Sequence, residues 1–359
     1  MAHGLADLSA ELTLVLPRPC ARDLEDSPYM TVRLAAPGGR AARQVAYEMS
    51  RCALFLRWWV TGRRVDLWIS RHSFLGLGLL LARLVARRVV LEVNGPIREE
   101  IEANQGSRVL AALSERLMLI QARASHLVVA VTPGLQQYLS ARVPGARCEV
   151  VANGATPRQV GRSQRQTSVP LVFAGALTPW YELEVPLQAL QQLRANGLDL
   201  RLDVLGDGAR FEELQQLATE LGVGDLVQFV GWVDPQAVQQ HLDGARVGLL
   251  PLRTKHASLD AVGSPIKLYE YVASGLRVVG TDIDGITNAP VMDSVDVYEP
   301  GDPTSCAAAI REALSQAGGR PLPEATWSWS ARAAELLEHV GSLDGERPLA
   351  GFSEPPRAG

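Results

Sequence analysis

The sequence predicts an α/β protein of two domains, in each of which helices cover a parallel sheet. Short β-branched apolar runs alternate along the chain with longer stretches of helical period, which is the pattern of parallel α/β architecture. Both halves contain apolar runs that are continuous, as in strands buried on both faces. At 359 residues the chain is long enough for two such domains.

The first predicted domain covers residues 1–160. We expect its strands at Leu12–Leu16, Thr31–Ala35, Val65–Ser70, Arg88–Val93, His126–Val131 and Cys148–Ala152. The helices between them cover residues 40–61, 75–86, 97–124 and 133–141. A doubly wound domain opens with a strand, a glycine-rich turn and a helix. This sequence begins within that helix, so we expect the first βα unit to be incomplete.

The second predicted domain covers residues 161–325, after the polar and proline-bracketed segment Thr156–Pro170. We expect its strands at Leu171–Ala174, Arg201–Leu205, Val227–Val230, Val247–Pro251, Arg277–Gly280 and Val295–Tyr298. Its helices cover residues 183–196, 210–221, 235–243, 265–274 and 303–317. We expect a last helix at residues 326–341, and one option is that it packs against the first domain. Residues 342–359 have the composition of a disordered tail.

Composition narrows the class of protein. The cysteines Cys20, Cys52, Cys148 and Cys306 are far apart and favour buried thiols in a reducing compartment. No signal peptide is recognisable, and no window has the roughly 18–20 apolar residues that span a bilayer. We therefore expect a cytoplasmic protein.

Several kinds of site have no signature in the sequence. The six histidines lack metal-ligand spacing, so we expect neither a metal nor a bound cofactor. A dehydrogenase is disfavoured because no dinucleotide fingerprint is present, and no module for binding nucleic acid is present either. His72, which follows a buried strand, is the histidine that we interpret as functional.

Charge differs between the two halves. Residues 1–160 hold 20 Lys and Arg against 13 Asp and Glu, whereas residues 161–359 hold 15 against 26. Either the charges scatter by chance, or the first half faces an anionic partner such as a lipid headgroup. Arg51–Arg64 mixes tryptophans with arginines, which suits a helix on a membrane surface and equally a core helix with a basic face. We keep peripheral contact with the inner face of a membrane as an open option.

The most informative segment is G-S-P-I-K-L-Y-E-Y-V-A-S-G at residues 263–275. We expect Ser264 to cap a helix with Pro265 at its first position, so that free backbone N–H groups face a phosphate. Lys267 and Glu270 lie three residues apart on one face and could meet phosphate and ribose. On spacing alone, an ordinary exposed Lys–Glu pair is the simpler interpretation.

The segment belongs to an ordered set of motifs. The second half contains F-A-G-A-L-T-P-W at 173–180, L-D-V-L-G-D-G-A-R-F-E-E-L at 202–214, V-Q-F-V-G-W-V at 227–233 and A-R-V-G-L-L-P at 245–251. The first half adds V-D-L-W-I-S-R-H at 65–72, L-E-V-N-G-P at 91–96 and V-V-A-N-G at 150–154. In this order the motifs resemble glycosyltransferase family 4, the retaining enzymes of GT-B fold, and S-P-x-K-L-x-E-Y resembles one of its branches. The resemblance implies two Rossmann-like domains that face each other across a cleft.

The resemblance also implies how a nucleotide-sugar donor would be held. The backbone at Ser264, Pro265 and Ile266 would hold the diphosphate, and Lys267 with Arg253 would offset its charge.

Further positions follow from the same motifs. Glu270 matches the second Glu of the family's E-x7-E motif and would bind the ribose. Gly175 would lie under the phosphates, and Gly206 and Val233 would border the base. In the first half, the resemblance gives His72 and Asn94 the role of contacting the donor sugar or the acceptor, as catalytic residues beside Lys267.

The sequence departs from the family at several of these positions. Val262 stands where many members carry the first Glu, Ala176 where many carry an Arg, and Thr178 and Glu182 where a phosphate-binding Lys is expected. We expect a metal-independent glycosyltransferase that retains configuration and acts on a glycan, a lipid-linked or a small-molecule acceptor. The alternative is a non-catalytic, glycosyltransferase-like binding or partner subunit. A sugar-nucleotide epimerase or a phosphorylase would share the fold but lacks a supporting motif here.

Overall fold

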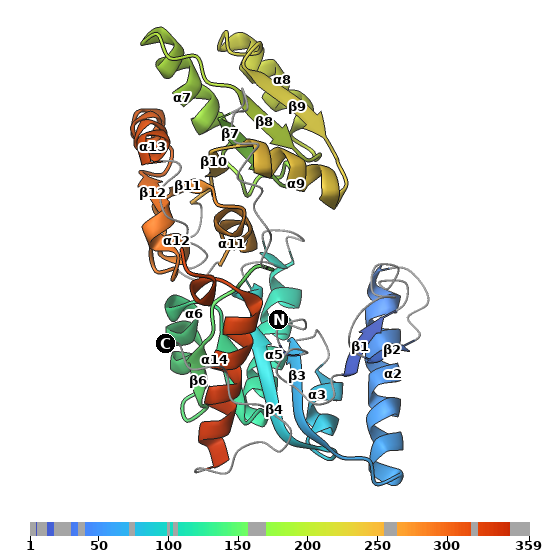
Figure 1. Cartoon of the computed structure of the whole chain (residues 1–359). Helices are drawn as coiled ribbons and strands as arrows, with labels where there is room; N and C mark the ends of the chain where they lie inside the picture. The colour runs from blue at the N-terminus through green and yellow to red at the C-terminus, as the bar shows by residue number, and fades with distance from the viewer. Residues whose placement is uncertain are drawn as a thin grey trace. The chain divides into compact units, whose positions relative to one another are not determined.

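The computed structural model describes residue 5 and residues 13–17, 30–34, 40–71, 76–98, 101–102, 107–156, 170–254, 264–316 and 322–344. It divides into two compact units (Figure 1). Unit 1 contains residues 1–152 and 329–359 with the short segment 261–264, and unit 2 contains residues 153–260 and 265–328. The α/β class that the sequence predicts is confirmed. Each predicted strand corresponds to a strand of the structure within about two residues.

Unit 1 contains a parallel sheet of four strands in the order β3-β4-β5-β6. Its strands are β3 (Val65–Arg71), β4 (Ala86–Val93), β5 (Leu127–Ala130) and β6 (Cys148–Val150). The strands β1 (Thr13–Pro17) and β2 (Met30–Leu34) pair with each other in a separate parallel sheet. The apolar pattern marks these two strands correctly, but it carries no information about which strands pair.

Among the described residues of unit 1 the α-helices with assigned bounds are α2 (Arg40–Val60), α3 (Leu77–Ala82), α5 (Arg108–Ala124), α6 (Pro133–Arg142) and α14 (Trp329–Gly341). Within the predicted helix over 97–124, residues 97–98 and 101–102 are helical, and a separate helix, α5, begins at Arg108. Ser107 is its N-cap and accepts a hydrogen bond from the Leu110 N–H at 3.3 Å. This cap fixes a new helix start within the predicted span.

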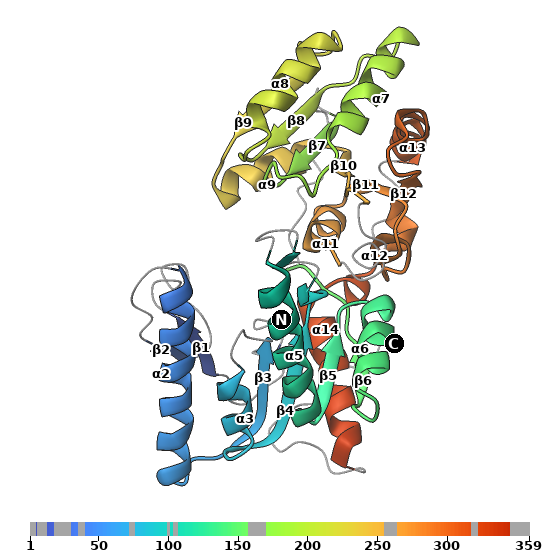
Figure 2. The same cartoon turned by 180° about the vertical axis from the view of Figure 1, so that it is seen from behind.

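The last helix, α14, packs on the four-stranded sheet of unit 1 (Figure 2). Its Leu336 and Val340 are fully buried in one apolar cluster with Val90, Leu127 and Val129 of strands β4 and β5. A segment from the far end of the sequence therefore supplies part of the core of unit 1.

Two of the places where the chain passes from one unit to the other follow Ala152 and Ser328. Beside these crossings the Ala155 N–H donates to the Trp327 carbonyl at 2.8 Å, and Ala155 forms a parallel bridge with Ser328. A Cβ on Gly154 would lie 3.0 Å from the Trp327 oxygen, so this position favours glycine.

Unit 2 contains a parallel sheet of six strands in the order β12-β11-β10-β7-β8-β9. The strands are β7 (Leu171–Ala174), β8 (Leu202–Leu205), β9 (Val227–Gly231), β10 (Val247–Leu250), β11 (Arg277–Thr281) and β12 (Val295–Tyr298). Its helices are α7 (Glu184–Ala195), α8 (Phe211–Glu220), α9 (Pro235–Gly244), α11 (Ile266–Ala273), α12 (Asp284–Thr287) and α13 (Pro303–Gln316). The strand order reverses between β7 and β10, which is where doubly wound sheets bind ligands.

Candidate functional site

The loops that follow β7, β8 and β9 are joined by backbone hydrogen bonds. The Gly175 N–H donates to the Leu205 carbonyl at 2.8 Å, and the Gly206 N–H donates to the Gly231 carbonyl at 2.7 Å. Gly206 has a φ of 132°, and a Cβ on it would lie 1.9 Å from the Gly175 oxygen. The position therefore requires glycine. Gly175 and Gly206, two of the predicted donor residues, lie in contact at the carboxyl edge of the sheet.

Lys267 comes to the same place from the first turn of α11. A Cβ on Gly175 would lie 2.5 Å from the Lys267 Cε and 3.1 Å from its Nζ, so the lysine side chain passes directly over Gly175. The Lys267 Nζ is 5.7 Å from the centre of the Tyr181 ring. The structure thus gathers a cation, an aromatic ring and a glycine at the end of β7.

Tyr271, one turn further along α11, fixes the helix on the sheet. Its hydroxyl oxygen accepts a hydrogen bond from the Ala174 N–H at 2.8 Å, and the side chain is fully buried. Burial raises the pKa of this phenol above its usual value, so it stays neutral at physiological pH. A Cβ on Gly248 of β10 would lie 2.4 Å from the Tyr271 ring, so glycine there leaves room for the ring. This contact positions Lys267.

The start of α11 corrects one prediction. The helix begins at Ile266, and Pro265 takes the N-cap position with an extended ψ of 117°, without a side-chain cap. Ser264 therefore does not cap the helix, because Pro265 lies before the first helical turn rather than in it. Ser264 and Pro265 are half-buried, and Ile266 and Glu270 are exposed. The binding of the diphosphate by the backbone at Ser264–Ile266 and of the ribose by Glu270 stays a prediction.

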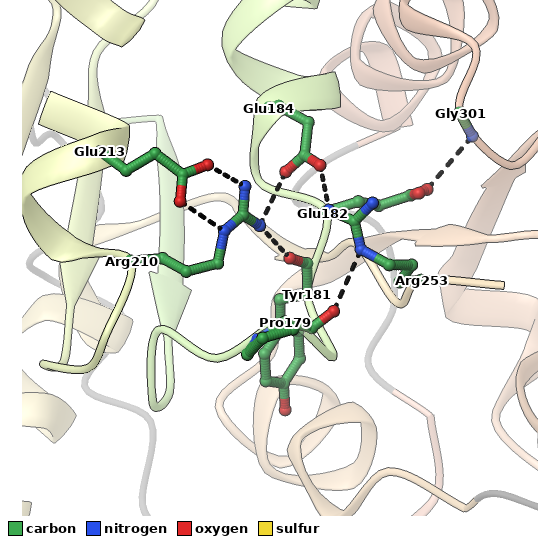
Figure 3. A network of polar contacts seen from close by, with 8 residues as sticks. All are labelled: Pro179, Tyr181, Glu182, Glu184, Arg210, Glu213, Arg253 and Gly301. Carbon is green, nitrogen blue, oxygen red and sulfur yellow. Dashed lines mark hydrogen bonds and ion pairs between the residues drawn. The ribbon is translucent and has the colours of Figure 1, made fainter. Parts of the chain in front are cut away.

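Arg253 lies in a network of ion pairs that also contains Arg210 (Figure 3). Its guanidinium pairs with the Glu184 carboxylate, and its Nε donates to the Pro179 carbonyl at 3.0 Å. Arg210 pairs with Glu184 at 2.9 Å and with Glu213 at 2.7 Å. The positive charge of Arg253, which the family resemblance assigned to the diphosphate, is thus paired with a carboxylate of the protein.

The Glu184 carboxyl is the centre of this network. Burial by itself would raise its pKa, but hydrogen bonds from its backbone, from Arg210 and from Arg253 outweigh burial and lower the pKa overall. Glu184 therefore stays ionised at neutral pH and joins the two guanidinium groups.

Glu182, two residues earlier, turns into the interior of unit 2. Its N–H donates to the Pro251 carbonyl at 2.8 Å, and its carboxylate accepts from the Gly301 N–H at 3.2 Å. Burial raises the pKa of this carboxyl, which the Gly301 hydrogen bond partly offsets. Glu182, which stands where the family pattern has a lysine, thus links the loop after β7 to the loop after β12.

The remaining predicted residues are spread over the chain. Val233 is half-buried in the loop between β9 and α9. Asn94 follows β4 in unit 1, and its buried Oδ1 has no hydrogen-bond partner among the residues that the structure describes. His72 and Val262 lie outside the described residues.

Sequence reasoning missed Tyr181, Tyr271 and the Glu184–Arg210 pair. The one local signal was the aromatic and acidic run W-Y-E-L-E at 180–184, which is unusual for a phosphate-binding loop. Within the described residues no group of three His, Cys, Asp or Glu could hold a metal ion. In the same part of the chain no helix is long and apolar enough to cross a bilayer.

Among curated proteins, the chain is similar to several glycosyltransferases. A GDP-mannose-dependent alpha-(1-6)-phosphatidylinositol monomannoside mannosyltransferase of Mycolicibacterium smegmatis is 32% identical over 180 residues, 47% of this chain and 46% of that protein. A putative colanic acid biosynthesis glycosyltransferase of Escherichia coli is 30% identical over 173 residues, 48% of this chain and 41% of that protein. The chain thus spans about half the length of the curated relatives that it matches.

Solved structures share the fold. A sucrose-phosphate synthase from Thermosynechococcus elongatus superposes with a TM-score of 0.69 at 17% identity, over 96% of this chain and 92% of that chain. HepE of Anabaena, in complex with UDP, superposes with a TM-score of 0.62 at 16% identity, over 92% of this chain and 99% of that chain.

Family models match both halves. The model of a glycosyl transferase 4-like domain matches residues 1–154, and the model of glycosyl transferases group 1 matches residues 169–316. The family predicted from the ordered motifs is confirmed, while the branch suggested by S-P-x-K-L-x-E-Y stays a prediction. The chain belongs to the glycosyltransferase group 1 family, with a glycosyltransferase 4-like first half, and it has the GT-B fold.

Proposed function

We propose that this chain transfers a hexosyl group from a nucleotide-sugar donor to an acceptor, with retention of configuration and without a metal. The observation that carries the proposal is the Lys267 side chain lying over Gly175, beside the contact between Gly175 and Gly206 at the carboxyl edge of the sheet. A cation on the leaving diphosphate stabilises the charge that develops in the transition state. The names of the relatives, a mannosyltransferase and a biosynthetic glycosyltransferase, support the same class of reaction.

The donor would be bound mainly by unit 2. The backbone at Ser264–Ile266, where α11 starts with the Ile266 N–H, faces the diphosphate, and Lys267 neutralises part of its charge. Glu270, exposed on the same helix, accepts hydrogen bonds from the ribose. Gly206 and Val233 border the base. Arg253 takes a different role from the one first expected, because its pairing with Glu184 makes it a support of the loop after β7.

The acceptor and the donor sugar would meet unit 1 at Asn94 and His72. The support for Asn94 is its buried Oδ1, which lacks a hydrogen-bond partner among the described residues and can accept one from a sugar hydroxyl.

Calorimetric titration with UDP, GDP and ADP tests the donor site. We expect one nucleotide to bind, and Glu270→Ala to weaken it by roughly ten- to a hundredfold, because a hydrogen bond to a charged group is lost. No binding to the wild type at millimolar concentration would overturn the donor site. Transfer assays with the matching nucleotide sugars, followed by NMR of the product's anomeric proton, test turnover and retention.

The same assays separate the enzyme from the non-catalytic subunit. The departures at Ala176, Thr178 and Glu182 favour the second candidate, because they remove basic groups from the first loop. Nucleotide binding without turnover on any acceptor, including lipid-linked sugars, would favour that subunit.

We further propose that unit 1 contacts the cytoplasmic surface of a membrane. Most of the large apolar side chains that the described residues expose lie on or beside α2, α3 and α5, and α3 packs against both other helices. They include Met49, Val60, Leu80, Val109 and Leu113. Exposed arginines accompany them, which suits anionic headgroups.

Vesicle sedimentation tests this contact. We expect binding to vesicles that contain phosphatidylglycerol and not to pure phosphatidylcholine, and a loss of binding in Val60→Asp. Leu198→Asp, at an exposed apolar residue of unit 2, is the matched control and should bind as the wild type does. Equal sedimentation of both variants with the wild type would contradict the proposal.

A further inference from the structure

The loop after β7 is held from two sides by arginines. The Arg210 guanidinium donates to the Tyr181 carbonyl at 2.8 Å, and that of Arg253 donates to the Pro179 carbonyl at 3.0 Å (Figure 3). Glu184 pairs with both guanidinium groups. The Arg253 N–H also donates to the Trp180 carbonyl at 2.9 Å. The backbone at Tyr181 is therefore fixed independently of its own side chain.

The Tyr181 ring points away from this network (Figure 3). One side of the ring packs edge-on against Phe173, with ring centres 5.1 Å apart and an interplanar angle of 76°. The Lys267 Nζ lies 5.7 Å from the ring centre. Within the part of the chain that the structure describes, Tyr181 makes hydrogen bonds through its backbone alone, so its phenol hydroxyl is available to a ligand.

Of the three basic side chains around the loop after β7, Lys267 alone has no carboxylate partner among the described residues. Arg210 and Arg253 are both paired with carboxylates, and Ala176 offers no side-chain donor. A phosphate oxygen accepts hydrogen bonds from hydroxyl groups as well as from cations, and a donor bonded to a charged acceptor is worth more than a neutral pair. The Lys267 side chain, which passes over Gly175, places its ammonium 5.7 Å from the centre of the Tyr181 ring, so a phosphate beside this ammonium also lies near the phenol.

We propose that the Tyr181 hydroxyl donates a hydrogen bond to the diphosphate of the nucleotide-sugar donor, beside Lys267, and that Glu184 holds the loop for it through Arg210 and Arg253. The inference rests on the proposed function and names a donor-binding residue that family motifs do not assign. No bond is made or broken by Tyr181 in this role.

Titration of Tyr181→Phe with the nucleoside diphosphate that binds the wild type, and with the corresponding nucleoside, tests the proposal. The variant keeps the ring that packs on Phe173 and removes the hydroxyl alone. We expect roughly a ten- to hundredfold loss of affinity for the diphosphate, and no change for the nucleoside, which has no phosphate. Tyr138→Phe is the matched control, since its hydroxyl donates to Glu115 in unit 1, and it should bind both ligands as the wild type does.

The outcomes separate this inference from the proposed function. A wild type that binds no nucleotide overturns both. A wild type that binds, with Tyr181→Phe binding equally well, overturns the role of Tyr181 alone. Equal losses for the diphosphate and the nucleoside also overturn it, because the hydroxyl would then support the loop rather than the phosphates. Tyr181→His, which retains an N–H donor on a smaller ring, should recover part of the diphosphate affinity, and unfolding curves verify that each variant is folded.

Discussion

The ends of the parallel strands are held differently in the two units. In unit 2, hydrogen bonds at Gly175 and Gly206 continue beyond the strands, and Arg210 and Arg253 fix the loop after β7. In unit 1, Asn94 follows β4 with a buried oxygen that no described residue satisfies. A preformed loop costs little entropy when it binds a ligand, whereas an unpaired polar group costs stability until a ligand arrives. The strand ends of unit 2 are thus preformed, whereas unit 1 has at Asn94 a buried acceptor without a partner among the described residues.

The largest expected effect tests how far unit 1 depends on its last helix. Leu336→Ala removes a fully buried side chain from the cluster that joins α14 to β4 and β5. We expect a loss of about 2–5 kcal/mol in the stability of unit 1, as for other large-to-small core changes. Hydrogen exchange followed peptide by peptide should show faster exchange in β4 and β5 and little change in unit 2. Leu193→Ala, in the core of unit 2, should give the reverse pattern, and uniform acceleration in both units would contradict independent cores.

A smaller effect tests the preformed loops of unit 2. Gly206→Ala places a Cβ where the Gly175 carbonyl lies, so we expect a loss of about 1–3 kcal/mol in stability together with loss of nucleotide binding. Gly222→Ala is the matched control, because Gly222 has a φ of 69° and nothing within 4 Å of its Cβ position. It should cost about 1 kcal/mol from backbone strain and leave binding intact. Urea unfolding and calorimetry measure both. Similar binding by the two variants would show that the loops are not closely packed.

A change at Asn94 tests the unmet hydrogen bond of unit 1. Asn94→Ala removes the unsatisfied buried oxygen, so stability should rise by up to about 1 kcal/mol while sugar transfer falls at least tenfold. Asn153→Ala is the contrasting variant, because Asn153 is buried and has a partner, and it should lose stability. Thermal unfolding and turnover are measured on the same samples. A loss of stability in Asn94→Ala would mean that its oxygen is satisfied in solution.

The smallest effect concerns pH and Glu182. Because burial raises the pKa of this carboxyl, its protonated form favours the folded state. The contribution of Glu182 to the free energy of unfolding is therefore full below the pKa that this carboxyl has in the unfolded chain. It is lost as pH rises through the higher pKa that the carboxyl has in the folded state. Glu182→Gln keeps an acceptor for the Gly301 N–H and should gain on the wild type across that window, by less than about 1.4 kcal/mol per pH unit. Urea unfolding from pH 4 to 8 measures the difference. Parallel curves for the two proteins would show that Glu182 does not titrate differently in the folded state.

The resemblance to glycosyltransferase family 4 singled out the glycines and the lysine of this region, and each sits beside a recognisable strand end or helix start. Gly175 and Gly206 follow apolar strands, and Lys267 lies in the first turn of α11. Strand ends in a parallel sheet meet at one edge, which agrees with the grouping of these residues that the resemblance to glycosyltransferase family 4 implied.

The sequence did not predict the arginine network, because its members are distant along the chain. Arg210 reaches the Tyr181 carbonyl across 29 positions, and Arg253 reaches Glu184 across 69. No periodicity links such residues, and a lone Arg253 in a loop is most simply assigned to a ligand. The capping role of Ser264 failed for a smaller reason, since the helix start was misplaced by one residue.

The late position of α14 in the sequence bears on how the chain folds during synthesis. Every strand of the unit 2 sheet lies within residues 171–298, a continuous stretch that the ribosome completes before α14 at residues 329–341 emerges. Until then the apolar face of β4 and β5 that Leu336 and Val340 cover has no helix on it. If the nascent chain were released before residue 329, unit 2 could fold, but the apolar face of β4 and β5 in unit 1 would lack α14. Such a product is a substrate for chaperones and proteases.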